Sequence, residues 1–153
     1  DQVTYLYHAS PGSDTAAGLA RVGSFPATRS SIGLCLLARL DANGLRERLP
    51  RGPLPDFPGG LAELRPRLAE VCRAGFACVV TPSGEASIAV PILPAACAGL
   101  AVSGVLAEEC RPQVRDALAE AAAFIAADLG EEAMAAGPGT RQQRPSDHSR
   151  SRP

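Results

Sequence analysis

Two late segments of the chain alternate small or hydroxyl-bearing side chains with bulky apolar ones. Because successive side chains of a strand point to opposite faces, the first segment has Ser87 and Ala89 on one face, and the second has Ala101 and Ser103. Hydroxyl groups between small side chains can orient a ligand in an otherwise apolar pocket. A helix packed closely over alanine and serine explains the same pattern without a ligand. The residues alone leave both interpretations open.

Common catalytic motifs are missing from the sequence, which contains no GxSxG elbow, Walker loop, GxGxxG fingerprint or HExxH motif. A serine–histidine–aspartate arrangement would need His8 as its base, because His148 lies near the C-terminal end. A single histidine in a strand is more often structural than catalytic. We therefore expect neither an enzymatic activity nor a cofactor.

The cysteines give no sign of a metal site or a disulfide framework. A structural zinc site needs clustered ligands, whereas none of the five cysteines forms a CxxC pair. All of them lie in apolar stretches, where a free cysteine packs as a small hydrophobic residue: Cys35, Cys72, Cys78, Cys97 and Cys110. We expect them to be reduced, which predicts a cytoplasmic location.

Composition predicts one globular domain with little affinity for nucleic acid. The 153 residues are 46% hydrophobic, enough for a core, and no apolar run approaches the roughly 20 residues of a membrane helix. All fifteen basic residues are arginine, but sixteen acidic residues leave a net charge of −1. Because phosphate neutralisation supplies most non-specific DNA affinity, this chain alone should bind DNA weakly or not at all.

Strand and helix patterns mix without a regular βαβ rhythm, which favours a mainly antiparallel sheet with helices packed on it. The segment Pro50–Gly60 contains four prolines and three glycines, so it is predicted to be a loop. Two-residue alternation and β-branched content predict strands over five segments: Val3–His8, Ala16–Val22, Phe76–Val80, Ser87–Leu93 and Gly99–Leu106.

Capping residues and helical spacing predict three helices before the late strands. The first is capped by Ser30 and runs to about Arg39, and a short second one is capped by Asp41. The third ends at Gly75, and it either kinks at Pro66 or begins next to it.

A last helix is predicted from Glu108 to Gly130, with acidic residues and a proline in its first turn, where a helix N-terminus favours them. Residues 131–153 have almost nothing to bury and should form a disordered tail rich in arginine, proline and serine. The apolar stripe of the helix is predicted to be Val114, Leu118, Ala121, Ile125 and Leu129.

Three segments carry a family pattern. Small residues and a glycine precede an Ala-Leu-Leu-Ala-like run in Phe25–Leu40, Gly-aromatic-Ala occurs near the end of Leu64–Val79, and Ser-Gly occurs late in Ser87–Val105. In this order they resemble the effector-binding domain of IclR-type bacterial transcription regulators, a relative of the GAF sensor fold. The resemblance implies an α+β, GAF/profilin-like fold. It covers about residues 1–130, which would form an N-terminally incomplete effector-binding domain, and the winged helix-turn-helix domain of such regulators lies outside this chain.

The same resemblance implies which residues bind the effector. In similar regulators, contacts come from the pair of residues before the helix glycine, from a position after Gly-aromatic-Ala, and from the two late strands. The corresponding residues are Ser31, Ile32, Val79, Ser87, Ala101 and Ser103. We expect them to line one cavity, with the Pro50–Gly60 loop close enough to cover it.

Departures from the family pattern remove polar groups from the expected pocket. Leu34 stands where a basic residue is usual, Val79 where an acid is common, and Ala101 where a second serine is frequent. Arg29 is the one nearby charge that could hold a carboxylate, but an exposed arginine near a helix start is the favoured explanation of it. We therefore expect a largely apolar or neutral effector, since a buried carboxylate needs a paired cation or hydrogen-bond donors.

The sequence thus predicts the ligand-sensing and oligomerising domain of an IclR-type transcription regulator, acting as a homodimer or tetramer. Such a domain would contact DNA only through a separate winged helix-turn-helix domain. The alternative is a stand-alone GAF-like module that binds a small molecule and has no role on DNA.

Overall fold

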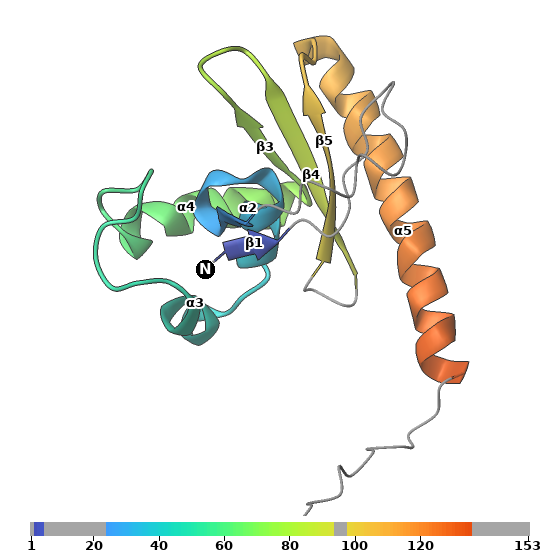
Figure 1. The fold of residues 1–153 in the computed structure, drawn as a ribbon, viewed down its shortest axis with the longest axis horizontal. Helices are drawn as coiled ribbons and strands as arrows, with labels where there is room; N and C mark the ends of the chain where they lie inside the picture. Colours follow the sequence, from blue (N-terminus) through green and yellow to red (C-terminus); the bar gives the residue numbers. More distant parts are fainter. Residues whose placement is uncertain (1, 5–23, 94–97, 136–153) are drawn as a thin grey trace, which may run out of the picture.

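The structure is a computed structural model that describes residues 2–4, 24–93 and 98–135 (Figure 1). Its strands are β1 (Gln2–Thr4), β2 (Ser24–Pro26), β3 (Ala77–Val80), β4 (Ala86–Ile92) and β5 (Ala98–Gly104). Its helices are α2 (Ser31–Leu37), α3 (Ala42–Arg48), α4 (Leu61–Ala74) and α5 (Arg111–Ala135), with short 3₁₀ turns η1 (Ala27–Arg29) and η2 (Glu108–Cys110). Among the described helices, none has both the length and the apolar character needed to cross a bilayer.

The strands confirm the predicted class of a helical and antiparallel-sheet fold. β3, β4 and β5 form a three-stranded antiparallel sheet in sequence order. The first strand was expected in the same sheet, but among the described residues β1 pairs with β2 in a separate two-stranded sheet, with Val3 opposite Phe25. The predicted strand Ala16–Val22 lies outside the described residues.

Helices cover both faces of the three-stranded sheet. Ile88, Val90 and Ile92 of β4 are buried against Leu118 and Ala122 of α5, so the bulky face packs on a helix as the alternation predicts. On the opposite face, α2 lies over β4 and β5. Figure 1 shows α5 on one side of the sheet and α2 with α4 on the other.

Local sequence signals place the start of α2. The Ser30 side chain accepts a hydrogen bond from the Gly33 backbone N–H at 2.9 Å, as predicted for an N-cap. A Cβ atom on Gly33 would lie 2.0 Å from the Ala27 carbonyl oxygen, so only glycine allows α2 to pack this closely on η1. Further along the helix, the buried Cys35 thiol donates a hydrogen bond to the Ala89 carbonyl at 3.1 Å.

The predicted start of α3 and the predicted end of α4 are confirmed, whereas one of the two predicted starts of α4 is wrong. Asp41 caps α3 by accepting from Gly44 N–H at 2.7 Å, and Gly75 ends α4 in the left-handed conformation with φ of 76°. The alternative that α4 begins beside Pro66 is wrong, because the helix begins at Leu61 and includes the proline.

The last helix differs from the prediction in its buried face and its end. Ala122 is buried, whereas the predicted Ala121 and Leu129 are exposed. The stripe that packs on the sheet continues from Leu118 through Ala122 to Ile125 and Ala126. Gly130 does not close the helix, which continues to Ala135.

Candidate functional site

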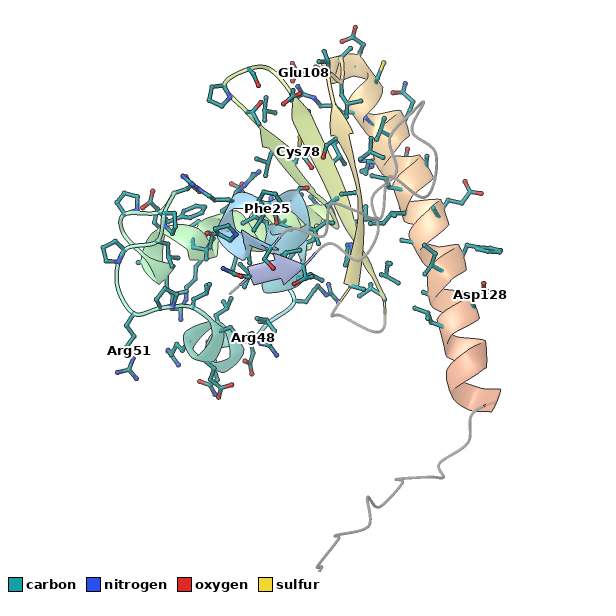
Figure 2. The ribbon with its side chains drawn as sticks, viewed as in Figure 1. Phe25, Arg48, Arg51, Cys78, Glu108 and Asp128 are labelled. Atoms are coloured by element: carbon teal, nitrogen blue, oxygen red, sulfur yellow. The ribbon has the colours of Figure 1, made fainter. Side chains whose placement is uncertain are left out.

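A cavity of about 390 Å³ opens at one end of the small-residue face of the sheet. One wall comes from β2, η1 and the start of α2, and the other comes from the β3–β4 hairpin and the end of β5. Figure 2 labels Phe25 of this first wall, which overlaps α2 in this view. The lining residues are Phe25, Pro26, Arg29, Ser30, Ser31, Val79, Thr81, Glu85, Ala86, Ser87, Ser103 and Gly104.

Three serine hydroxyls form a continuous chain in this cavity. Ser103 Oγ donates to Ser87 Oγ at 2.7 Å, and Ser87 Oγ shares a second hydrogen bond of 2.7 Å with Ser31 Oγ. The strand register brings the first two together, because Ser87 and Ser103 are directly opposed on β4 and β5. Ser31 is only 1% exposed and comes from the first turn of α2.

The chain of hydroxyls can both accept from and donate to a ligand. Each hydroxyl has one proton and two acceptor lone pairs. If Ser31 donates to Ser87, then Ser87 accepts two hydrogen bonds and its own proton is available to a ligand. With either direction of that bond, Ser103 gives its proton to Ser87 and its oxygen can accept from a ligand hydroxyl or amide. These are neutral hydrogen-bonding groups, suited to a hydroxyl, carbonyl or amide.

One ion pair lies at the rim of the cavity. Arg29 holds Asp56 through two hydrogen bonds, from Nε to Oδ2 at 2.7 Å and from Nη2 to Oδ1 at 3.1 Å. The hydrogen bond from Arg29 is the main cause that lowers the pKa of Asp56 below its ordinary value. Both side chains are largely exposed, so the pair is a solvated one. The arginine is therefore already occupied by a carboxylate of this chain.

Four of the six residues predicted to bind an effector line this cavity: Ser31, Val79, Ser87 and Ser103. Ile32 and Ala101 do not. Ile32 is buried in the core, and a Cβ atom on Gly99 would lie 3.3 Å from its side chain. Ala101 lies opposite the fully buried Ala89 and packs against the same core.

The small-residue face thus has a part that a helix covers and a part that faces the cavity. Close helix packing explains Ala89, Gly99 and Ala101 in the middle of the sheet, under α2. At the end of the sheet, beyond the first turn of this helix, Ser87 and Ser103 face the cavity. A small side chain alone could not distinguish the covered part from the open part.

Part of the site was missed by sequence reasoning. Thr81 and Glu85 line the cavity from the β3–β4 turn. Thr81 holds this turn by accepting from Glu85 N–H at 3.1 Å, while Gly84 adopts a positive φ of 86°. The signal in the sequence is a Thr-Pro-Ser-Gly-Glu turn between two apolar strands.

The Pro50–Gly60 loop approaches the site at one point. Its Asp56 reaches Arg29 on the rim, but most of the loop lines a separate cavity of about 410 Å³ beside α3 and the start of α4. The loop is therefore attached to the rim rather than laid over the opening. Within the described residues, no cluster of three or more histidine, cysteine, aspartate or glutamate side chains could hold a metal ion.

No protein-family model and no curated protein sequence matches the chain. Solved structures do match. An IclR homologue from Microbacterium hydrocarbonoxydans, complexed with 4-hydroxybenzoate, is 33% identical with a TM-score of 0.57, over 74% of this chain and 50% of that one. An IclR transcriptional regulator from Alicyclobacillus acidocaldarius is 26% identical with a TM-score of 0.59, over 83% of this chain and 56% of that one.

A third solved structure contains an isolated ligand-binding domain. The inducer-binding domain of the PobR transcription factor from Acinetobacter, in complex with 3-hydroxybenzoic acid, has a TM-score of 0.51 at 21% identity. The match covers 71% of this chain and 70% of that domain, and at this identity it bears on the fold alone. The chain spans about half the length of the two regulators above. These comparisons confirm the resemblance to the effector-binding part of IclR-type regulators.

Proposed function

We propose that this chain, which has the fold of the effector-binding domain of IclR-type transcription regulators, senses a small-molecule effector in the serine-lined cavity. The residues proposed to contact the effector are Ser31, Val79, Ser87 and Ser103. Ile32 and Ala101 are proposed to act behind them, as the packed layer that fixes the position of α2 on the sheet. The chain would bind its ligand without catalysing a reaction and without a cofactor.

The observation that carries the proposal is the chain of three hydroxyls in a cavity of about 390 Å³. This volume lies within the range of small-molecule sites, which are mostly apolar with a few placed polar groups. Phe25, Pro26, Val79 and Ala86 supply apolar surface around the hydroxyls. The 33% identical IclR homologue was solved with 4-hydroxybenzoate, which supports a small, partly apolar ligand here.

A sensing role follows if the effector favours one arrangement of the two cavity walls. The walls belong to elements far apart in sequence, so a ligand that contacts both would stabilise the arrangement that fits it best. In the proposed regulator, this difference would be passed to a homodimer or tetramer in the cytoplasm. From there it would reach a separate winged helix-turn-helix domain that binds DNA.

Filling the cavity tests the site. Ser103→Leu places a large side chain at the exposed end of the hydroxyl chain, and it should abolish binding of any effector found in a thermal-shift screen of small aromatic acids, amides and phenols. Val102→Leu is the matched control, because Val102 is the preceding residue of β5, faces the other side of the sheet and is 40% exposed. Equal effector affinity in Ser103→Leu and wild type, measured by calorimetry, would overturn this site.

A further inference from the structure

We propose that Asp56 makes the cavity select neutral ligands over carboxylates, because it pairs with Arg29, the one cation among the described residues that line the cavity. This inference rests on the proposed function and adds a specificity-determining residue to it. Asp56 belongs to the Pro50–Gly60 loop, 27 residues away from Arg29 in sequence. It acts as an internal carboxylate held at the place where the carboxylate of a ligand would otherwise bind.

The contact has the geometry of a recognition pair. Both oxygens of Asp56 are used, each by a different nitrogen of Arg29, at 2.7 and 3.1 Å. This fork is how a guanidinium binds a planar carboxylate in proteins generally. A ligand carboxylate could form these two hydrogen bonds only after Asp56 had left. Nη1 and the second N–H of Nη2 can still donate, so the selection against an acid comes mainly from the charge of Arg29 that Asp56 already balances.

The remaining charge near the cavity also opposes an anion. Among the described lining residues, Arg29 and Glu85 are the two with a formal charge, and they come from opposite walls. When Asp56 is counted with them, the described part of the rim has one positive and two negative charges. An incoming carboxylate would meet a net negative rim, whereas a neutral hydroxyl or amide would meet only the hydroxyls of Ser31, Ser87 and Ser103.

The strength of this selection is bounded by the exposure of the pair. Side-chain exposures are 56% for Arg29 and 43% for Asp56, so water screens both charges. Exposed ion pairs of this kind are weak. We therefore expect a discrimination of between about three- and tenfold against the acid, rather than complete exclusion.

The experiment uses aromatic carboxylic acids, each matched with its own primary amide, with 4-hydroxybenzoate and 4-hydroxybenzamide as the first pair. Dissociation constants are measured by calorimetry for wild type, Asp56→Asn and the double variant Arg29→Gln/Asp56→Asn. Asp116→Asn is the control, since it removes the same charge from an exposed ion pair with Arg115 on α5. Thermal unfolding of each variant checks that the fold is retained.

Wild type should bind the amide more tightly than the acid. In Asp56→Asn the acid should gain between about three- and tenfold while the amide changes little, and the double variant should lose this gain. Asp116→Asn should behave as wild type. An unchanged ratio of acid to amide affinity in Asp56→Asn, with either probe bound by wild type, would overturn this inference and leave the proposed function in place. If every variant failed to bind any pair, the proposed function itself would be wrong, and the inference with it.

Discussion

In the proposed site, single hydroxyl groups serve both the stability of the fold and the binding of a ligand. Ser31 is almost fully buried, and its hydroxyl forms a hydrogen bond with the Ser87 hydroxyl. Ser103 is exposed and completes the chain from the solvent side. The inner serine pair therefore supports the fold, while in the proposed site the outer serine would change its partner when a ligand binds. The Cys35 thiol behaves differently, because burial raises its pKa to about 11 and keeps it a neutral donor to Ala89.

Removing the middle hydroxyl should be costly. Ser87→Ala leaves the buried Ser31 hydroxyl without this partner, and we expect the free energy of unfolding to fall by about 1–3 kcal/mol. Ser103→Ala removes a hydrogen bond whose outer end is exposed, so its effect should stay below about 1 kcal/mol. Urea unfolding of both variants checks the difference. Equal destabilisation would mean that Ser31 finds another partner when Ser87 is lost.

Among the elements, α2 decides where the cavity can be. It packs on η1 through Gly33 and covers the middle of the sheet through Ile32 and Cys35. Its first turn supplies Ser31 to the cavity, and Ser30 at its N-cap lines the same space. A shift of α2 along the sheet would therefore either fill the cavity or separate the three serines.

Two glycine substitutions in helices should have opposite effects. Gly33→Ala would place a Cβ atom 2.0 Å from the Ala27 carbonyl oxygen, and backbone cannot move aside cheaply, so we expect a loss of about 3 kcal/mol or more. Gly130→Ala has no neighbouring atom within 4 Å at its Cβ position, and it should stabilise α5 by about 0.5–1 kcal/mol. Thermal and urea unfolding measure both changes. A neutral Gly33→Ala would contradict the close packing of α2 on η1.

The elements that could be predicted from sequence are those fixed by local chemistry. Ser30, Asp41 and Gly75 act within one turn of their own helices, so neighbouring residues were enough to identify them. The buried face of α5 was misread by one position, because alanine occupies many of its positions and gives little contrast between faces.

The candidate site was predictable only in part, for a different reason. Two-residue alternation put Ser87 and Ser103 on the same kind of face, and the strand register then opposed them. Whether a helix covers that face depends on tertiary packing, which separated Ala101 from Ser103. The pair between Arg29 and Asp56 joins two segments with no shared pattern, and sequence alone could not have found it.

At the scale of the whole molecule, the two faces of the β3–β4–β5 sheet have different roles. The bulky face is used for stability, because it buries Ile88, Val90 and Ile92 against α5. The small face ends in the cavity. A ligand there would contact α2, η1 and the β3–β4 hairpin without disturbing the apolar packing between the sheet and α5. Figure 1 shows α5 on one side of the sheet and α2 with α4 on the other. An effector signal in the proposed regulator would therefore begin on the α2 side.

The charge of the molecule leads to a last prediction, that this chain alone recognises no specific DNA site. Acidic residues outnumber the fifteen arginines, so no surplus is available to neutralise phosphates. Arginines also form ion pairs with acids, as Arg29 and Arg115 do, and Figure 2 shows Arg48 and Arg51 on the side of the molecule away from α5. Fluorescence anisotropy with DNA from upstream of its own gene, at physiological salt, should detect only weak binding without sequence preference.

The same assay, repeated on the complete gene product, distinguishes the two functional hypotheses, a transcription regulator and a stand-alone binding module. A regulator should bind the DNA tightly through a winged helix-turn-helix domain encoded in frame with this sequence, and the effector should change that affinity. A stand-alone GAF-like module should bind the effector in the same cavity and leave DNA unbound. Tight, sequence-dependent binding by the present chain alone would contradict both hypotheses, because a chain with balanced charge has no surplus of positive charge to bind the phosphates of DNA.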